Sequence, residues 1–150
     1  MNRRLLREKL LQFLFQVDVQ KEEFQKVLNI FLMDEENEGI DKTDIQQQIT
    51  DIYQSLETID QTISKYLKEW TLDRLATVDR SILRIATFEI LYQEDIPVKV
   101  SINEAVELAK TFGSNESSKF INGVLGAMVK DHPEWGQKGV KDVIKDIAKD

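Results

Sequence analysis

Residues 78–92 read VDRSILRIATFEILY, and this stretch decides the fold. At 3.6 residues per turn, its apolar side chains lie in nearly every direction around a helix: Ile82, Leu83, Ile85, Ala86, Phe88, Ile90 and Leu91. A helix that is apolar on all sides is expected in the interior of a domain. The stretch therefore predicts a central, mostly buried helix around which the other elements pack.

The chain after this helix carries clear start and stop signals. Pro97 forces a break, and Ser101 and Glu104 form a Ser-x-x-Glu capping box in front of an apolar run. Gly113 then supplies a stop signal. We therefore expect a second helix that starts near Ser101 and ends before Gly113.

One more helix is expected after Gly113. Ser114 or Asn115 is a suitable cap, and the apolar residues Phe120, Ile121, Val124, Leu125 and Met128 follow at helical spacing. Gly123 and Gly126 lie inside this helix, where each costs about 1 kcal/mol relative to alanine. We interpret the two glycines as points of close packing.

Helical spacing also dominates the chain before residue 78. One stripe has Leu6, Leu10, Phe13, Leu14 and Val17, a second has Phe24, Val27, Leu28 and Phe31, and the longest has Ile45, Ile49, Ile52, Tyr53, Leu56, Ile59, Ile63, Tyr66 and Leu67. The longest segment is one helix or two, since Thr58 and Asp60 are each able to cap a new start. No sustained strand-like alternation is found, so the sequence predicts an all-α, compact bundle of about six to seven helices.

The composition points to a binding protein rather than an enzyme. The chain of 150 residues has no cysteine, and its one histidine, His132, stands beside Pro133 as a surface residue would. We find no motif for a phosphate loop, a nucleophile or a metal site, and we read residues 34–38 as a solvated acidic loop. We therefore expect that the protein needs no cofactor or metal. We find no signal peptide and no apolar run of membrane length, so we expect a cytoplasmic protein.

Positive charge is concentrated at the amino terminus. The net charge is −7, yet residues 1–33 carry six Lys and Arg against four Asp and Glu, whereas residues 34–63 carry one against nine. Helical spacing predicts Arg4, Arg7, Leu11 and Phe15 on one exposed strip, and a guanidinium group is well suited to phosphate. The alternative is a charged helix start that only keeps the terminus soluble.

Two long stretches of the sequence are distinctive. Residues 78–91 read VDRSILRIATFEIL, and residues 95–110 read DIPVKVSINEAVELAK and continue as Phe112-Gly113 and KFINGVL at 119–125. Both stretches resemble the NusB family. The residues Arg3, Arg4, Arg7-Glu8 and Gln12 match the arginine-rich start of that family. On this resemblance, residues 1–130 are a NusB-like RNA- and protein-binding domain in two helical subdomains. Residues 131–150 extend past the resemblance, and the helical spacing of Val140, Val143, Ile144 and Ile147 predicts a short helix in this C-terminal extension.

The resemblance implies a transcription antitermination factor. Such a factor pairs with NusE, a small-subunit ribosomal protein, binds the single-stranded boxA RNA of ribosomal RNA leaders, and joins the elongating RNA polymerase. The positions that match the RNA surface of the family are Arg3, Arg4, Arg7, Tyr66, Phe112, Glu116, Lys119 and Phe120. The positions that match its NusE-facing surface are Phe15, Asp73 and Asp79.

Two other interpretations stay open at this point. The chain is then either a protein-interaction module without RNA binding, which the negative net charge favours, or a detached NusB-like domain of a ribosomal RNA methyltransferase. If the chain does bind RNA through Arg3, Arg4 and Arg7, each arginine is expected to contact one phosphate. Each such contact to a single strand contributes about −0.7 to the slope of log K against log[salt], so we predict a slope near −2. Such a shallow slope implies that base stacking and the partner supply the rest of the affinity.

Overall fold

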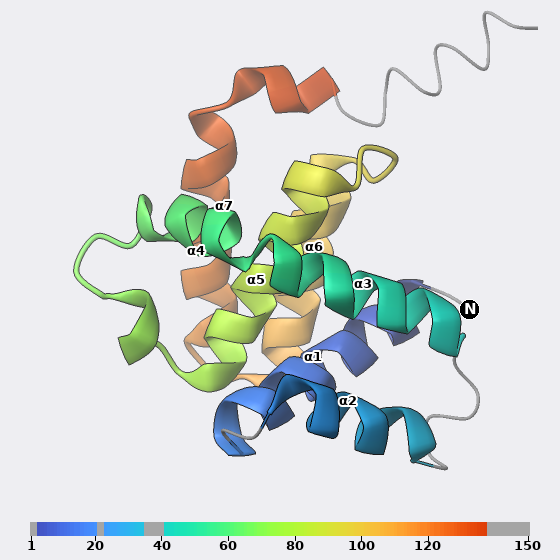
Figure 1. The fold of residues 1–150 in the computed structure, drawn as a ribbon. Helices are drawn as coiled ribbons and strands as arrows, with labels where there is room; N and C mark the ends of the chain where they lie inside the picture. Colours follow the sequence, from blue (N-terminus) through green and yellow to red (C-terminus); the bar gives the residue numbers. More distant parts are fainter. Residues whose placement is uncertain (1–2, 21–22, 35–40, 138–150) are drawn as a thin grey trace, which may run out of the picture.

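The computed structural model describes residues 3–20, 23–34 and 41–137. These residues form the helices α1 (Arg3–Gln20), α2 (Phe24–Met33), α3 (Lys42–Gln54), α4 (Leu56–Ser64), α5 (Thr77–Tyr92), α6 (Val98–Phe112) and α7 (Ser117–Lys130), with the short 3-10 turns η2 (Leu72–Arg74) and η3 (Pro133–Gln137). No strand occurs within these ranges. The prediction of an all-helical fold with six to seven helices is confirmed (Figure 1).

Helix α5 is the central element, as its sequence predicts. Every residue from Ser81 to Ile90 is buried except Arg84. The helix contacts α1, α4, α6 and α7, and Figure 1 shows it in the middle of the bundle. The buried residues form one cluster with members from all seven described α-helices, so α5 belongs to a single continuous core.

Aromatic packing joins the first three helices. The apolar stripe of α1 is buried as expected except for Val17, which is partly buried, and Phe13 lies at its centre with no exposed surface. The Phe13 ring makes edge contacts with Phe24, Phe31 and Tyr53, at centroid distances of 5.7, 5.4 and 6.3 Å. Such pairs add about 0.5–1.5 kcal/mol each beyond the area that they bury, so they help to hold α2 and α3 against α1.

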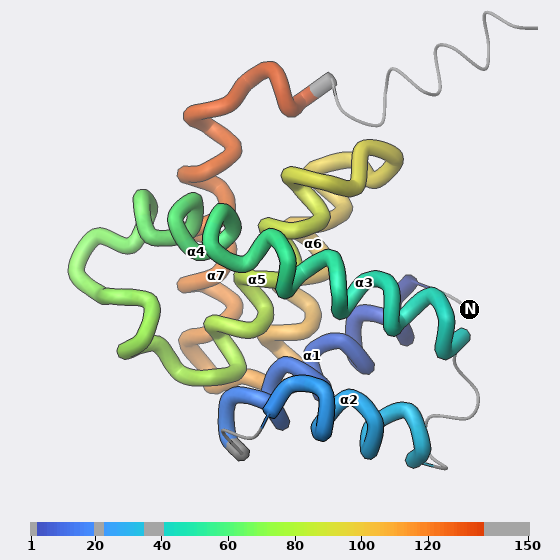
Figure 2. The backbone as a smooth tube through the Cα atoms, in the orientation of Figure 1, coloured from blue at the N-terminus to red at the C-terminus, as the bar shows by residue number. Residues whose placement is uncertain are grey.

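The long third segment is two helices and not one. The backbone leaves helical geometry at Ser55, and Figure 2 shows α3 and α4 following one another along nearly the same line across α5. Thr58 and Asp60 both lie inside α4, so the prediction that one of them caps it is wrong. The buried isoleucines on both sides of Ser55 continue one stripe, so the apolar spacing carries no sign of the break.

Helix α6 begins earlier than its capping-box pattern predicts. The helix starts at Val98, directly after Pro97, so the assignment of Ser101 and Glu104 as a capping box is wrong. The Ser101 hydroxyl instead donates a hydrogen bond to Glu89 of α5 at 2.9 Å. Proline is well suited to the start of a helix. Its ring fixes φ at a value that the helix start allows, and it has no backbone N–H that would need a hydrogen-bond partner.

A tight turn joins α6 to α7. A Cβ atom added to Gly113 would lie 2.6 Å from the Cβ of Ser117, so this position has room only for glycine. The Ser114 amide donates to the Ser117 hydroxyl at 2.9 Å, whereas the residue before α7 is Glu116, whose side chain makes no capping hydrogen bond. Neither Ser114 nor Asn115 is therefore the N-cap that we expected.

The glycines inside α7 do not pack closely against the rest of the chain. A Cβ atom added to Gly123 or Gly126 would meet no atom within 4 Å among the described residues, and both glycines are exposed. The interpretation of these two residues as close-packing points is wrong. The apolar side of α7, with Ile121 and Leu125, faces the core instead.

Some expectations fall on residues 35–40 and 138–150. The acidic loop, apart from Asp34, and the expected helix with Val140, Val143, Ile144 and Ile147 lie outside the described residues. In the part of the chain that is described, no helix is long and apolar enough to cross a membrane.

Candidate RNA and partner interface

Arg3 and Arg4 lie exposed at the start of α1, and each is paired with a carboxylate. Arg4 donates from Nε and Nη2 to the two oxygens of Glu104, at 3.2 and 2.9 Å, and Arg3 pairs with Asp95. The hydrogen bond from Arg4 lowers the pKa of Glu104. The Arg4 side chain is still 66% exposed, and its Nη1 amino group is not used by Glu104. A phosphate is therefore able to approach Arg4 from solvent.

Arg7 has a different environment, deep between α1, α5 and α6. It is 5% exposed and donates from Nε and Nη2 to Glu89, at 2.7 and 2.8 Å. Leu11 is also 5% exposed, so the prediction that Arg7 and Leu11 share an exposed strip with Arg4 and Phe15 is wrong. Position 7 faces inward because the buried carboxylate of Glu89 needs a partner, and a phosphate would have to compete with that pair.

A mainly apolar groove lies between α1, the start of α5 and the end of α6. Its volume is about 330 Å³, and its lining includes Phe15, which is 40% exposed, and Phe112, which is 48% exposed. Leu11 and Val78 add apolar surface, while the polar lining residues are Glu8, Lys9 and Gln12. The groove thus brings a residue predicted to contact RNA next to one predicted to contact the protein partner.

A second hollow of about 250 Å³ lies between the first turn of α5 and the start of α7. Asp79 lines it together with Glu116 and Phe120, and Trp70 and Arg74 come from the segment before α5. The Oδ1 atom of Asp79 is buried and has no hydrogen-bond partner among the described residues. A buried acceptor without a donor is unfavourable, so this atom is a candidate to accept a hydrogen bond from a bound partner.

Tyr66 is not brought to these hollows. The half-buried Tyr66 has a raised pKa, caused first by burial and then by its hydrogen bond to Asp131, which follows the last residue of α7. Lys119 lies in the first turn of the same helix and Glu116 directly before it, and both are exposed. Because α7 has 14 residues, Tyr66 at its end is separated from Glu116 and Lys119 at its start by roughly 20 Å, at 1.5 Å per residue.

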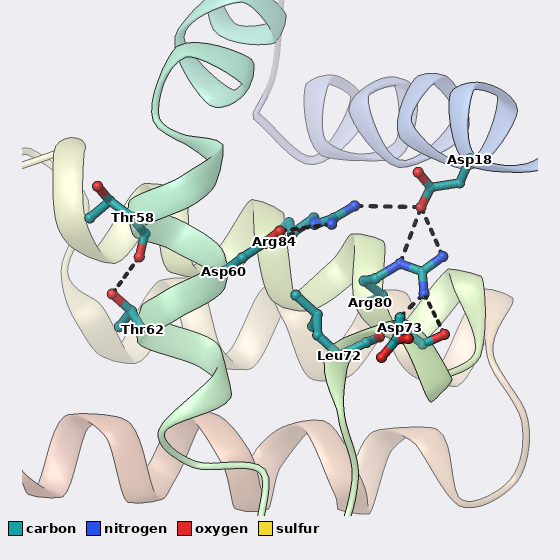
Figure 3. A network of polar contacts seen from close by, with 8 residues as sticks. All are labelled: Asp18, Thr58, Asp60, Thr62, Leu72, Asp73, Arg80 and Arg84. Carbon is teal, nitrogen blue, oxygen red and sulfur yellow. Dashed lines mark hydrogen bonds and ion pairs between the residues drawn. The ribbon is translucent and has the colours of Figure 1, made fainter. Parts of the chain in front are cut away.

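A polar network holds the predicted partner residue Asp73 next to α1 and α5 (Figure 3). Arg80 donates to Asp18 of α1 from Nε at 3.3 Å and from Nη2 at 3.2 Å. Its Nη1 atom donates to the carbonyl oxygens of Leu72 and Asp73, at 3.2 and 3.4 Å. Asp73 itself is exposed, and a hydrogen bond from Thr71 is the main reason that its pKa is lowered.

Sequence reasoning missed several residues of this region. Trp70 is 56% exposed beside the second hollow, and the one available signal was a large aromatic residue in an otherwise polar segment. Arg80 and Arg84 were read only as parts of a buried helix, although each pairs with an aspartate of another helix. Their partners are 62 and 24 residues away, so no local pattern reports them.

The described residues contain no group of three or more His, Asp or Glu side chains able to hold a metal ion. His132 stacks on Trp135 at a centroid distance of 3.9 Å, and its Nδ1 lies 3.0 Å from Glu134. It therefore interacts with the segment that directly follows α7 and lines neither hollow.

Comparison with known proteins identifies the family. The NusB family model matches residues 4–130. A transcription antitermination protein NusB of Exiguobacterium is 47% identical over 131 residues, which cover 87% of this chain and 99% of that protein. The solved structure of T. maritima NusB is 40% identical, with a TM-score of 0.78 and coverage of 88% of this chain and 93% of that chain.

A more distant structure has the same fold. It is described as antitermination factors NusB and NusE in complex with double-stranded RNA, and it is 24% identical, with a TM-score of 0.75 and coverage of 87% and 97%. The family model extends from the first turn of α1 to the end of α7, and the Exiguobacterium relative covers 87% of the chain. By sequence and by fold, this chain belongs to the NusB family.

Proposed function

We propose that this chain is a transcription antitermination factor. In this role it binds boxA-type single-stranded RNA of ribosomal RNA leaders together with NusE and joins the elongating RNA polymerase. Its role is binding and not catalysis, and it works in the cytoplasm, where the nascent transcript is made. Family membership supports the proposal. The 47% identical relative is a transcription antitermination protein, and the match covers 99% of it.

The observation that carries the RNA-binding part is the exposed start of α1 beside half-exposed aromatic rings. Arg4 presents a guanidinium group to solvent, and Phe112 stands 48% exposed in the groove beside α1. Single-stranded RNA is typically held by contacts of this kind, in which cations meet phosphates and aromatic rings stack on bases. Arg7 then supports α1 from within instead of contacting RNA, since Glu89 occupies it.

The alternative of a protein-interaction module without RNA binding also has an observation in its favour. Both exposed arginines of α1 are paired with carboxylates, Arg3 with Asp95 and Arg4 with Glu104, so little uncompensated positive charge remains there. The methyltransferase alternative has no such support, because the 47% identical relative, of which the match covers 99%, is a transcription antitermination protein.

An RNA titration separates the two functions. Fluorescence anisotropy is measured with a labelled boxA RNA and with a scrambled RNA of equal composition, with and without NusE. We expect weak binding by the chain alone, a marked gain with NusE, and a preference for boxA. Phe112→Leu should weaken binding by about tenfold, since stacking contributes about 1–3 kcal/mol per base.

Tyr92→Leu is the matched control. Tyr92 is 44% exposed, at the far end of α5 from both hollows, and its substitution should leave RNA affinity unchanged. Binding of NusE without any binding of RNA would instead support the protein-interaction module.

A further inference from the structure

We infer that Arg80 is a positioning residue, which holds the three predicted partner-facing residues in one arrangement. The inference rests on the proposed function, because Phe15, Asp73 and Asp79 form a useful surface only if a partner such as NusE binds there. Arg80 itself is only 15% exposed in its side chain and offers little surface of its own to a partner.

The contacts of Arg80 reach all three elements that carry these residues. Its Nε and Nη2 atoms hold Asp18, which lies on α1 one turn after Phe15. Its Nη1 atom holds the backbone of η2, where Asp73 is the middle residue. Its own backbone directly follows Asp79 in the first turns of α5. One guanidinium group therefore connects α1, η2 and α5, as Figure 3 shows.

Besides Arg80, the turn η2 is held by the partly buried side chain of Leu72, which packs against the hydrophobic core, and by contacts with α4. None of its three residues is buried. Two hydrogen bonds close it, from the Arg74 amide to Thr71 at 3.0 Å and from the Leu75 amide to Leu72 at 3.3 Å. The Leu72 carbonyl accepts both the Leu75 amide and Arg80, so the side chain of Arg80 attaches the turn to α5 at the point where the turn closes.

The planar shape of arginine is essential to this arrangement. Its Nε/Nη2 edge faces the carboxylate of Asp18 while Nη1 faces two carbonyl groups on another side. A lysine has a single ammonium group, which is unable to span both sets of acceptors. Arg80→Lys therefore keeps the charge and removes the connection.

Arg84 provides a matched control one turn further along α5. It is equally shielded, 13% exposed in its side chain, and donates from Nε and Nη2 to Asp60 of α4, both at 2.9 Å. Its Nη1 also donates to Asp18 at 3.5 Å, but the structure gives Arg84 no hydrogen bond to η2. Arg84→Lys thus damages a comparable ion pair without releasing the turn.

The experiment compares the two variants in two measurements on the full chain. Hydrogen exchange of the Arg74 and Leu75 amides is followed in the free protein, and affinity for purified NusE is measured by calorimetry. We expect Arg80→Lys to accelerate exchange at both amides and to weaken NusE binding, each by about tenfold. Arg84→Lys should lower the melting temperature at least as much but leave both quantities at their wild-type values.

Each outcome tests a separate part of the inference about Arg80. Unchanged exchange in Arg80→Lys overturns the connection to the turn, and accelerated exchange with unchanged NusE affinity overturns its role in presenting the partner surface. An equal loss of affinity in both variants would mean that only general stability matters, which also overturns the inference. A wild-type chain that fails to bind NusE contradicts the proposed function itself, and the exchange measurement, which needs no partner, then decides whether Arg80 orders the turn.

Discussion

Arg7 on α1 and Glu89 on α5 form a buried ion pair with two hydrogen bonds, at 2.7 and 2.8 Å. The residues are 82 positions apart, and Ser101 of α6 donates a further hydrogen bond to the same carboxylate. This pair fastens the helix that carries the exposed arginines to the centre of the bundle. It also separates the three arginines of α1 into one structural residue and two that face solvent.

Arg7→Ala should destabilise the protein by about 3–5 kcal/mol, because it leaves Glu89 as a buried charge without its main partner. The free energy of unfolding is measured by urea denaturation. Glu89→Gln together with Arg7→Met should recover much of the loss, since a neutral pair requires less desolvation. A loss below about 0.5 kcal/mol, the usual range of surface changes, with a large fall in RNA affinity would instead make Arg7 an RNA contact.

Arg4→Ala should have the opposite profile. Its side chain is 66% exposed, so stability should change by less than about 0.5 kcal/mol. The slope of log K against log[salt] for RNA should become shallower by about 0.7, the value for one phosphate contact to a single strand. Lys26→Ala, which removes an exposed charge on α2, serves as the control. If both variants have the wild-type slope, the α1 arginines do not contact phosphate.

The pair of Arg4 and Glu104 predicts a pH dependence of stability. Its hydrogen bond lowers the pKa of Glu104 below the usual value of 4.5. A carboxyl group with a lowered pKa in the folded state stabilises the protein at higher pH, and this contribution is lost as the pH falls through that lowered value. Wild type should therefore be slightly more stable than Glu104→Gln at pH 7, and the difference should vanish in acid. A difference in urea midpoint that stays constant from pH 7 to well below 4.5 would refute this assignment.

Phe15→Ala should weaken NusE binding by about tenfold, as expected for an aromatic residue at the centre of an interface. Phe15 is 40% exposed, so the melting temperature should shift by no more than a few degrees. Val19→Ala is the control, since Val19 is 56% exposed one turn further along α1. A large loss of stability with normal NusE affinity would place Phe15 among the structural residues.

The helices themselves were largely predictable from the sequence, and some of their ends were not. The apolar residues identify α5 as the central helix, because a helix that is buried on all sides needs apolar residues in nearly every direction. The break at Ser55 was not predictable in this way, since the stripe of buried isoleucines continues across it. At α6 the Ser101/Glu104 pattern was misleading, because both side chains serve ion pairs and hydrogen bonds to other helices.

The candidate site was predictable as a region but not in its details. Spacing along α1 correctly separates Phe15 from the buried stripe, but it wrongly placed Arg7 and Leu11 on the exposed side. Spacing does not report that Glu89 lies opposite Arg7 or that Asp18 lies opposite Arg80, because these pairs join distant parts of the chain. Long-range partners of charged residues are what the structure adds to the sequence.

The most direct test of the antitermination role is a transcription assay with purified RNA polymerase and NusE. The template carries a boxA leader followed by a terminator, and full-length RNA is quantified with and without this chain. We predict that the chain increases read-through on the boxA template and has no effect when boxA is scrambled. Equal read-through with and without the chain on the boxA template, under conditions where a known NusB protein is active, would contradict the proposed function.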